Sequence, residues 1–272
     1  MKPSGIITLM TDFGLRDPYV AMIKGVILSI NPEAKVIDIS HQVSAGSIFQ
    51  GALLIRETYP YFPPGTVHVA VVDPSVGSDR RLIAVEVDNH FFVGPDNGIF
   101  WPILQEHDIS KVMHLTEDRY FLPVVSYTFH GREVFAPVSA HLTLGVTLES
   151  LGSPIEDPVA IAIPVAREKE GVLYGEIIRV DNFGNLITNI HQQEFEEYLS
   201  SAPPVIEIGN LTVKKFGFIF VDVEEGEPLA LINSSQLLEI AVNLGRASDY
   251  LEKESGEIIG TMVRVRKSGN VL

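Results

Sequence analysis

The sequence contains no cysteine among its 272 residues. Disulfide bonds, thiolate metal ligands and cysteine nucleophiles are therefore excluded, because each of them needs a thiol. Basic residues are also scarce: 20 Lys and Arg stand against 35 Asp and Glu, which gives a formal net charge of −15. Such an acidic chain repels the phosphates of nucleic acids and anionic lipids, so we expect it to bind neither nucleic acid nor a membrane surface.

Long hydrophobic runs are missing as well. No segment approaches the roughly eighteen apolar residues that a membrane-spanning helix needs. The first apolar stretch, residues 6–10, is followed by Asp12 and is too short for the apolar region of a signal peptide. We therefore expect a cytoplasmic protein. Its 46% of hydrophobic residues suit one large folded domain or two ordinary ones.

The first half of the chain alternates strand-like and helix-like segments. A continuous apolar run at 66–72 predicts a buried strand, whereas the apolar residues of 20–30 recur at helical spacing. Apolar strands separated by helices are typical of a mostly parallel sheet that is covered on both faces. The segment 82–93 predicts a hairpin added to that sheet.

The pattern changes after residue 150. The stretch 151–171 carries three prolines and a charged cluster, which suits a linker. Beyond it, short strand-like runs are separated by Gly, Asn and Pro, as in a small β-barrel or sandwich. We therefore expect an α/β protein with two domains. Residues 1–160 would form a mostly parallel sheet covered by helices, and residues 170–272 a smaller C-terminal β-barrel.

Polar residues directly follow several of the apolar strands, where open α/β sheets bind their ligands. Asp12 ends the first strand and could accept hydrogen bonds from two ribose hydroxyls, or cap the next helix. For Asp17, five residues later, helix capping is the simpler reading. Asp73 closes the strand at 66–72, and Arg80 follows it across a glycine-containing turn. This pair could keep a carboxylate ionised beside a water molecule, or be an ordinary ion pair in a turn.

His130 and Asp96 complete the candidates in this half. His130 lies between a strand-like stretch and a predicted helix start, whereas Asp96 belongs to the turn-like segment 94–98. Together with Asp12 and Asp73 they could provide metal ligands. No two of them have the spacing of ligands on one helix face, so we expect no metal centre and no cofactor.

Two polar segments interrupt the β-rich second half: VDNFGNLITN at 180–189 and INSS at 232–235. Their candidate residues are Asp181, Asn185, Ser234 and Ser235. These side chains could be turn residues, or could hydrogen-bond a base edge and an amino acid. The chain has no GxxxxGK[ST], GxGxxG, HExxH or GxSxG motif, so nucleotide binding would have to avoid phosphate groups.

Six motifs, taken in order, resemble one family. They are TDFG (11–14), VVDPSVGSDRR (71–81), GPDNG (94–98), TFHGRE (128–133), VDNFGNLITN (180–189) and INSS (232–235). This set is similar to the S-adenosyl-L-methionine hydrolases, or hydroxide adenosyltransferases, which are related to the enzymes that make fluorinated or chlorinated adenosine. Each motif alone is weak, but the resemblance spans almost the whole chain and keeps the order.

The resemblance implies an N-terminal α/β domain, a C-terminal β-barrel and a homotrimer. Each ligand would lie between the N-terminal domain of one subunit and the C-terminal domain of its neighbour. It further implies S-adenosyl-L-methionine as substrate and adenosine and methionine as products.

The same resemblance makes Asp73, Arg80 and His130 the residues that hold and activate water. The halogenating relatives have Tyr at the positions of Asp73 and His130, and Ser at that of Gly131. A halogenase Trp aligns with Gly46. These departures favour water over halide as the nucleophile.

Substrate contacts carry over in the same way. The resemblance implies that Asp12 binds the ribose hydroxyls and that Asn185 meets the adenine. The residues that it assigns to the methionine moiety are Asp17, Asp181 and Ser234. Ser235 stands where some relatives have Arg, and we include it among the expected substrate contacts.

The expected reaction is in-line attack of water on the ribose C5′, which expels neutral methionine and leaves adenosine. No general acid is needed for the leaving group, because cleavage neutralises the sulfonium. Two alternatives remain open: a metal-dependent hydrolase built on the three aspartates and the histidine of the first half, and a non-catalytic protein that binds adenosine or S-adenosylmethionine. The trio of Asp73, Arg80 and His130 favours an enzyme, since binding alone needs no water-activating set.

Overall fold

The computed structural model describes residues 2–108, 110–251 and 258–268. The chain divides into two compact units, Met1–Ala162 and Ile163–Leu272. Each unit contains a β-sheet with its own buried apolar residues, so the α/β class is as predicted. None of the helices in the described residues has the length and apolar character that crossing a bilayer requires.

The first unit is built on a seven-stranded sheet in the order β2-β1-β3-β5-β4-β6-β7. Its strands are β1 (Ile6–Thr11), β2 (Lys35–Ser40), β3 (Val67–Val71), β4 (Leu82–Val87), β5 (His90–Pro95), β6 (Ser110–Leu115) and β7 (Gly152–Pro154). The pairs β1–β2, β1–β3 and β3–β5 are parallel, whereas β4–β5, β4–β6 and β6–β7 are antiparallel. The prediction of a mostly parallel sheet is therefore corrected to a mixed one, because the predicted hairpin and two further strands extend it in the antiparallel sense.

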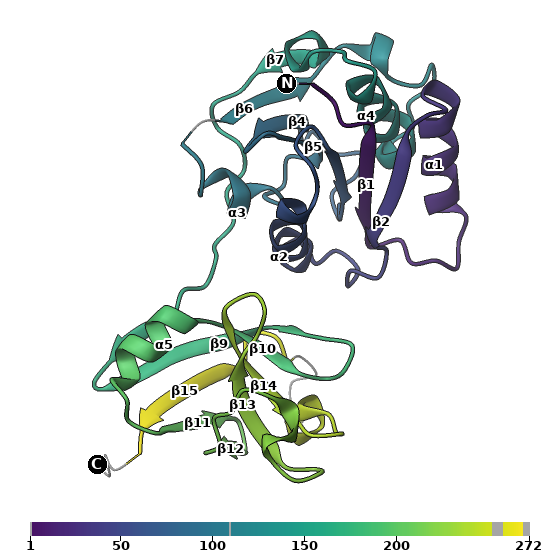
Figure 1. The fold of residues 1–272 in the computed structure, drawn as a ribbon. Helices are drawn as coiled ribbons and strands as arrows, with labels where there is room; N and C mark the ends of the chain where they lie inside the picture. Colours follow the sequence, from purple (N-terminus) through teal and green to yellow (C-terminus); the bar gives the residue numbers. More distant parts are fainter. Residues whose placement is uncertain (1, 109, 252–257, 269–272) are drawn as a thin grey trace. The chain divides into compact units, whose positions relative to one another are not determined.

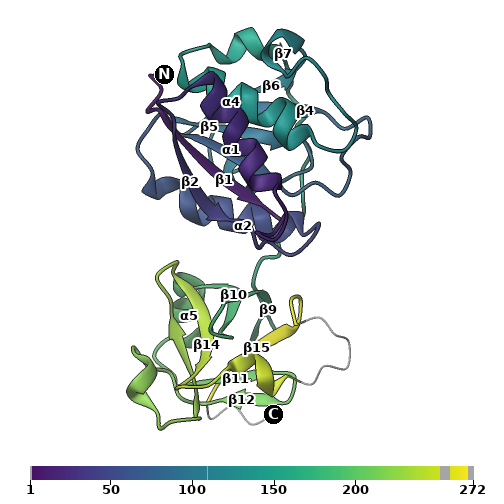
Figure 2. The same ribbon diagram turned by 90° about the vertical axis from the view of Figure 1, so that its right-hand side faces the viewer.

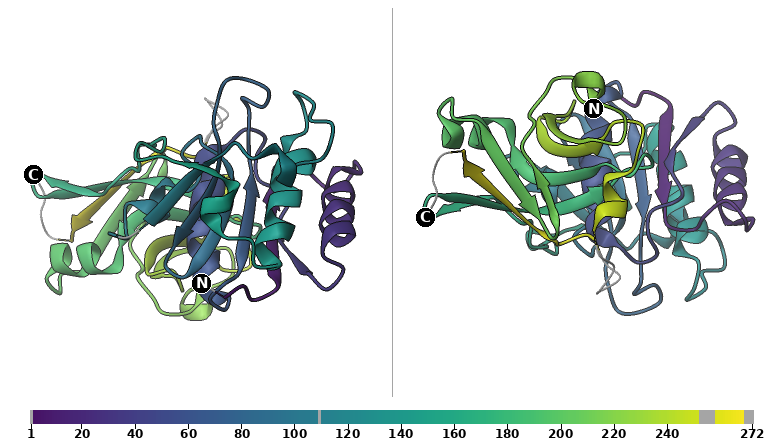
Figure 3. Two further views of the ribbon diagram at one scale, coloured as in Figure 1. Left: turned by 90° about the horizontal axis from the view of Figure 1, so that it is seen from above. Right: turned by 90° about the horizontal axis from the view of Figure 1, so that it is seen from below.

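Helices cover both faces of this sheet (Figures 1 and 3). They are α1 (Tyr19–Ile30), α2 (Ile48–Thr58), α3 (Trp101–Leu104) and α4 (Ala136–Thr143), with a π turn at Gly131–Phe135 and 3-10 turns at Tyr59–Tyr61, Asp118–Tyr120 and Leu148–Leu151. Ile7 and Leu9 of β1 pack with α1 and α4, whereas Met10 packs with α2. The alternation shows that both faces of the strand are buried.

Several loops meet at the carboxyl ends of the parallel strands. β1 and β3 end side by side, because their register pairs Thr11 with Val71. β5 runs parallel to β3 on its other side, and β4 starts beside the end of β5, with Leu82 opposite Pro95. The loop 72–81, which joins β3 to β4, therefore passes over the end of β5.

The second unit is built on an eight-stranded sheet in the order β12-β11-β15-β9-β10-β14-β13, with β8 paired to β9. Its elements are β8 (Arg167–Lys169), β9 (Val172–Val180), β10 (Leu186–His191), α5 (Gln192–Leu199), β11 (Pro204–Ile208), β12 (Leu211–Val213), β13 (Pro228–Ile232), β14 (Leu237–Val242) and β15 (Met262–Lys267), with 3-10 turns at Phe220–Asp222 and Ala247–Tyr250. The residues that directly follow β12 form hydrogen bonds with β13, at the opposite edge of the sheet. There Gly217 N–H donates to the carbonyl of Ala230, and Ala230 N–H donates to that of Lys215, both at 2.9 Å. The sheet thus comes close to a closed barrel.

Two features of this region differ from the sequence prediction. Helix α5 was not among the predicted elements; it buries Phe195, Tyr198 and Leu199 and lies beside β10 and β14 (Figure 2). The predicted linker 151–171 is partly wrong, because it contains β7 of the first sheet and β8 of the second.

Candidate active site

Asp73 and Arg80 form a buried ion pair across the loop 72–81. Asp73 directly follows the end of β3, and Arg80 folds back so that its Nε lies 2.8 Å from Oδ1 and 2.7 Å from Oδ2 of the carboxylate. Nη2 of Arg80 also contacts Oδ2. The Arg80 side chain is only 6% exposed and that of Asp73 only 4%. Removing one partner from a buried pair leaves an uncompensated charge, which costs about 3–5 kcal/mol.

His130 contacts the guanidinium group of Arg80. Gly77 in the middle of the loop 72–81 packs against Tyr127, which lies just before the π turn at Gly131–Phe135. The φ angle of Gly77 is +83°, and a Cβ atom there would lie 2.2 Å from the carbonyl oxygen of Tyr127. Only glycine allows this approach. The approach places Nη2 of Arg80 3.0 Å from Nδ1 of His130. The structure thus brings together the three residues expected to activate water.

The contact with Arg80 determines the proton position on His130. A guanidinium group can only donate hydrogen bonds, so Nδ1 of His130 must accept. The neutral ring therefore carries its proton on Nε2. Burial, and next the positive charge of Arg80, lower the pKa of His130, against the opposing effects of Asp73, the Ser126 backbone and Glu133. The ring is consequently neutral at pH 7.

One donor of this cluster has no protein partner. Nη1 of Arg80 is buried, and no hydrogen-bond acceptor among the described residues reaches it. Leaving such a group unsatisfied costs about 1–3 kcal/mol. An N–H group of this kind suits the oxygen of a small ligand or of water.

Asp12 and Asp17 precede α1 in different settings. Asp12 is half-buried after β1, and its Oδ2 accepts a hydrogen bond of 2.8 Å from the N–H of Gly46. Gly46 in turn lies against Pro74, so the loop of Asp12 and the loop 72–81 share a neighbour. Asp17 is exposed, and the N-cap position of α1 is Pro18, without a side-chain cap bond. Neither aspartate caps the helix, so that reading is wrong.

Asp96 does not join the other expected metal ligands. Its Oδ2 accepts from Nε of Arg81 at 2.7 Å, and its Oδ1 accepts from the N–H of Val159 at 2.8 Å. In the part of the chain that the structure describes, no three His, Asp or Glu side chains are arranged to hold a metal ion. The ligand set of the metal-dependent alternative is therefore not assembled.

The second unit contains the remaining candidates in two turns. In the β9–β10 turn, Oδ1 of Asp181 accepts from the N–H groups of Phe183 and Asn185, each at 2.9 Å, and its Oδ2 accepts from Nδ2 of Asn185 at 3.1 Å. The carboxylate thus shapes its own turn. In the β13–β14 turn, Ser234 is exposed and Ser235 is half-buried.

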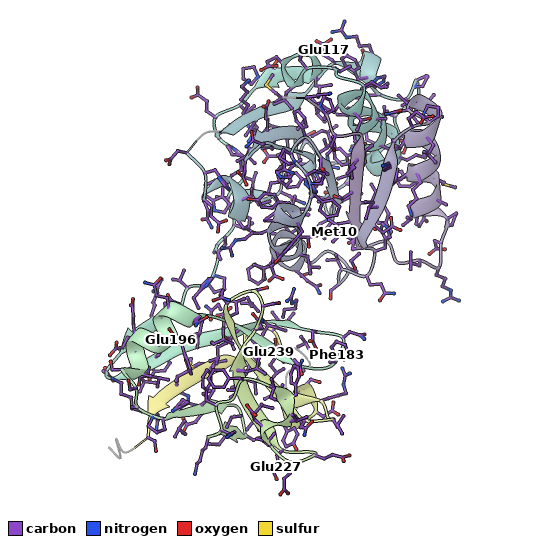
Figure 4. The ribbon with its side chains drawn as sticks, in the orientation of Figure 1. Met10, Glu117, Phe183, Glu196, Glu227 and Glu239 are labelled. Carbon is purple, nitrogen blue, oxygen red and sulfur yellow. The ribbon has the colours of Figure 1, made fainter. Side chains whose placement is uncertain are left out.

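Glu239 links these two turns, and the sequence reasoning missed it. It lies in the middle of β14 and is only 7% exposed (Figure 4). Its Oε2 accepts from Nδ2 of Asn233 at 3.2 Å, and a further hydrogen bond joins it to Asn185. Burial, and to a lesser degree the charge of Asp181, raise its pKa. The available signal was one charged residue within the otherwise apolar run LLEIAV.

Phe183 is a second residue that the candidate list lacks. It is 71% exposed in the β9–β10 turn, two positions before Asn185 (Figure 4). An exposed aromatic ring suits stacking on a flat heterocycle. The sequence shows the aromatic residue within a polar motif, but not its exposure.

Comparison with known proteins gives matches along most of the chain. Residues 7–152 match the model of the SAM hydroxide adenosyltransferase N-terminal domain, and residues 175–260 match that of the C-terminal domain. The chain is 37% identical to a protein of Methanocaldococcus jannaschii named (R)-S-adenosyl-L-methionine hydrolase, over 91% of this chain and 94% of the relative. A protein of the same name from Salinispora tropica is 35% identical, over 94% and 97%.

More distant and structural relatives agree with these matches. A fluorinase of Actinopolyspora mzabensis is 29% identical over 97% of both chains. The crystal structure of an uncharacterized conserved protein from Thermotoga maritima superposes with a TM-score of 0.88 at 33% identity, covering 96% of this chain and all of that one.

Proposed function

This chain belongs to the SAM hydroxide adenosyltransferase family, and on that basis we propose that it hydrolyses S-adenosyl-L-methionine to adenosine and L-methionine. The observation that carries the proposal is the chain of contacts from Asp73 through Arg80 to His130. A protein that only binds its ligand needs no such set. The protein is accordingly an enzyme, an S-adenosyl-L-methionine hydrolase.

In the proposed mechanism, water attacks C5′ of the ribose in line with the C–S bond. The new C–O bond forms as the C–S bond breaks, the sulfur leaves with the bonding electrons as neutral methionine, and the water loses one proton. Asp73 accepts that proton, and Arg80 fixes the position of its carboxylate. His130 has its only ring donor at Nε2, which suits holding the water oxygen rather than taking its proton.

The polar residues outside this trio are proposed to bind the substrate. Asp12 would bind the ribose hydroxyls. In the second unit, Asn185 and the exposed ring of Phe183 suit the adenine. The proposed contacts of the methionine moiety are Asp17, Asp181 and Ser234, and Ser235 is proposed as a further substrate contact. We also propose a homotrimer with active sites between subunits, as the family resemblance implies.

The proposal is tested by incubating the purified protein with S-adenosyl-L-methionine and separating the products by chromatography. We expect equal amounts of adenosine and methionine, unchanged by a chelator. Asp73→Asn should lower kcat by at least about a hundredfold, in the range for loss of a general base. Asp79→Asn, an exposed neighbour in the same loop, is the matched control and should retain activity.

Two other results would contradict the proposal. Tight binding of the substrate without turnover would favour the non-catalytic alternative. Loss of turnover with chelator, restored by a divalent cation, would favour the metal-dependent one.

A further inference from the structure

The motif GPDNG, residues 94–98, has no part in the reaction as described, although it continues directly from β5 beneath the loop of Asp73 and Arg80. We propose that Asn97 and Asp96 are positioning residues that fix the two ends of that loop. The inference rests on the proposed function, because it concerns the residues that activate water there.

Asn97 holds the first end of the loop. Its Nδ2 donates to the carbonyl oxygen of Val72 at 2.8 Å, and its Oδ1 accepts from the N–H of Ile99 at 3.2 Å. The carboxamide is therefore held from both sides. Val72 directly precedes Asp73, so this bond fixes the backbone from which the carboxylate projects.

Asp96 holds the second end. Its N–H donates to the carbonyl oxygen of Arg81 at 3.0 Å, and its carboxylate accepts from Nε of Arg81 at 2.7 Å. The Asp96 side chain is only 2% exposed. Arg81 directly follows Arg80, so main-chain and side-chain bonds both fix the backbone that carries the guanidinium group.

Both anchors directly follow the same strand, β5. β5 lies between β3 and β4, and the loop 72–81 crosses its end. A Cβ atom at Gly94 would lie 2.4 Å from the carbonyl oxygen of Ala70, so β5 approaches β3 as closely as glycine permits. Asp96 and Asn97 therefore fix the distance between the two ends of the loop 72–81. The ion pair of Asp73 and Arg80 is a second constraint on the same loop. A displacement of about 1 Å in such a group can lower a rate about a hundredfold.

The test replaces only the donor of Asn97. Asn97→Asp keeps an oxygen for Ile99 N–H but sets a second oxygen against the carbonyl of Val72. The matched control is Asn31→Asp, at the end of α1. There Nδ2 donates to Oγ1 of Thr143 at 2.9 Å, and Oδ1 accepts from Glu33 N–H at 3.1 Å. Each change removes one donor from a carboxamide whose oxygen accepts from the N–H group two residues on, although the acceptor of the lost donor is a carbonyl at Asn97 and a hydroxyl at Asn31.

We expect Asn97→Asp to lower kcat for S-adenosyl-L-methionine about tenfold to a hundredfold while KM changes less than about threefold. Asn31→Asp should lower the melting temperature to a similar extent and leave kcat unchanged. Equal kcat values in the two variants would overturn the inference. If Asn97→Asp does not fold, Asp96→Asn carries the same test, with the same expected fall in kcat.

A second readout separates this inference from the proposed function. The imidazole of His130 is titrated by NMR in each variant, with its signal assigned from a His130→Gln spectrum. The charged groups that face it are Arg80, Asp73 and Glu133. A displaced Arg80 should let the pKa of His130 rise in Asn97→Asp but not in Asn31→Asp. An unchanged pKa would overturn the inference, whereas a wild-type protein without turnover would contradict only the proposed function.

Discussion

At the residue scale, one hydrogen bond assigns the roles in the proposed mechanism. Because Arg80 donates to Nδ1 of His130, a protonated ring would place an N–H group against the guanidinium group. Both the bond and the positive charge of Arg80 therefore disfavour the imidazolium. Asp73 is then the remaining acceptor for the proton of the attacking water.

This arrangement predicts the acid limb of the pH profile. Since the pKa of His130 is lowered, kcat should stay constant as the pH falls to 6.5 and decrease only at lower pH, where the ring becomes protonated. The measurement is kcat between about pH 4.5 and 9, with circular dichroism showing that the fold persists. His130→Gln should lower kcat and remove the decrease in kcat at low pH that protonation of this ring causes. A limb above pH 6.5 would contradict the assignment.

The sequence singles out Asp73, which closes an apolar run, and Arg80, which follows it across a glycine-containing turn. It singles out His130 because this residue precedes a predicted helix. For Glu239 it shows only a charged residue within an apolar run, and for Asn97 only a turn-like motif. Glu239 bonds to both Asn233 and Asn185, which lie in two different turns, and Asn97 bonds to the carbonyl oxygen of Val72. Such roles arise from contacts between segments distant in sequence, which residue type and spacing do not reveal.

At the scale of elements, a polar network joins three neighbouring strands of the first sheet. Oγ1 of Thr8 in β1 lies 2.8 Å from Nδ1 of His68 in β3, and Nε2 of His68 lies 3.1 Å from Nδ1 of His90 in β5. The ring of His68 stacks on Phe92. Burial, and to a lesser degree His90, lower the pKa of His68 to about 3. The strands therefore hold this histidine neutral.

This network predicts a loss of stability in acid. Below pH 6.5 the unfolded chain binds a proton at His68 that the folded chain does not bind until about pH 3, so stability falls as the pH decreases through this range. Between pH 7.5 and 5 the contribution of His68 is about 2 kcal/mol. Urea unfolding, followed by the fluorescence of Trp101 in the same unit, measures it. His68→Gln should weaken the dependence of the unfolding free energy on pH, whereas His191→Gln, at an exposed position, should not. The same pH dependence in both variants would refute this role of His68.

Elements with strong periodicity are predictable, and short edge strands are not. The spacing in 20–30 predicts α1, which buries Val20, Ile23 and Ile27, and the hairpin at 82–93 is confirmed as β4 and β5. By contrast, β7 and β8 are three residues each and lie within a proline-rich stretch. Their strand conformation depends on pairing with β6 and β9, so local sequence gives little sign of it.

At the scale of the whole molecule, the proposed function draws on both units. The first unit contains Asp73, Arg80 and His130, and the second contains Asn185 and Phe183. The family models match both units separately. The net charge of −15 favours the approach of a cationic sulfonium over that of phosphorylated nucleotides.

The most direct test of the central claim is a reaction in water enriched in oxygen-18, followed by mass spectrometry of the products. Attack of water at C5′ predicts that the label enters the 5′-oxygen of adenosine and is absent from methionine. The labelled product should form with or without chelator and be lost in Asp73→Asn. Unlabelled adenosine, or free adenine as the first product, would contradict displacement at C5′ by water.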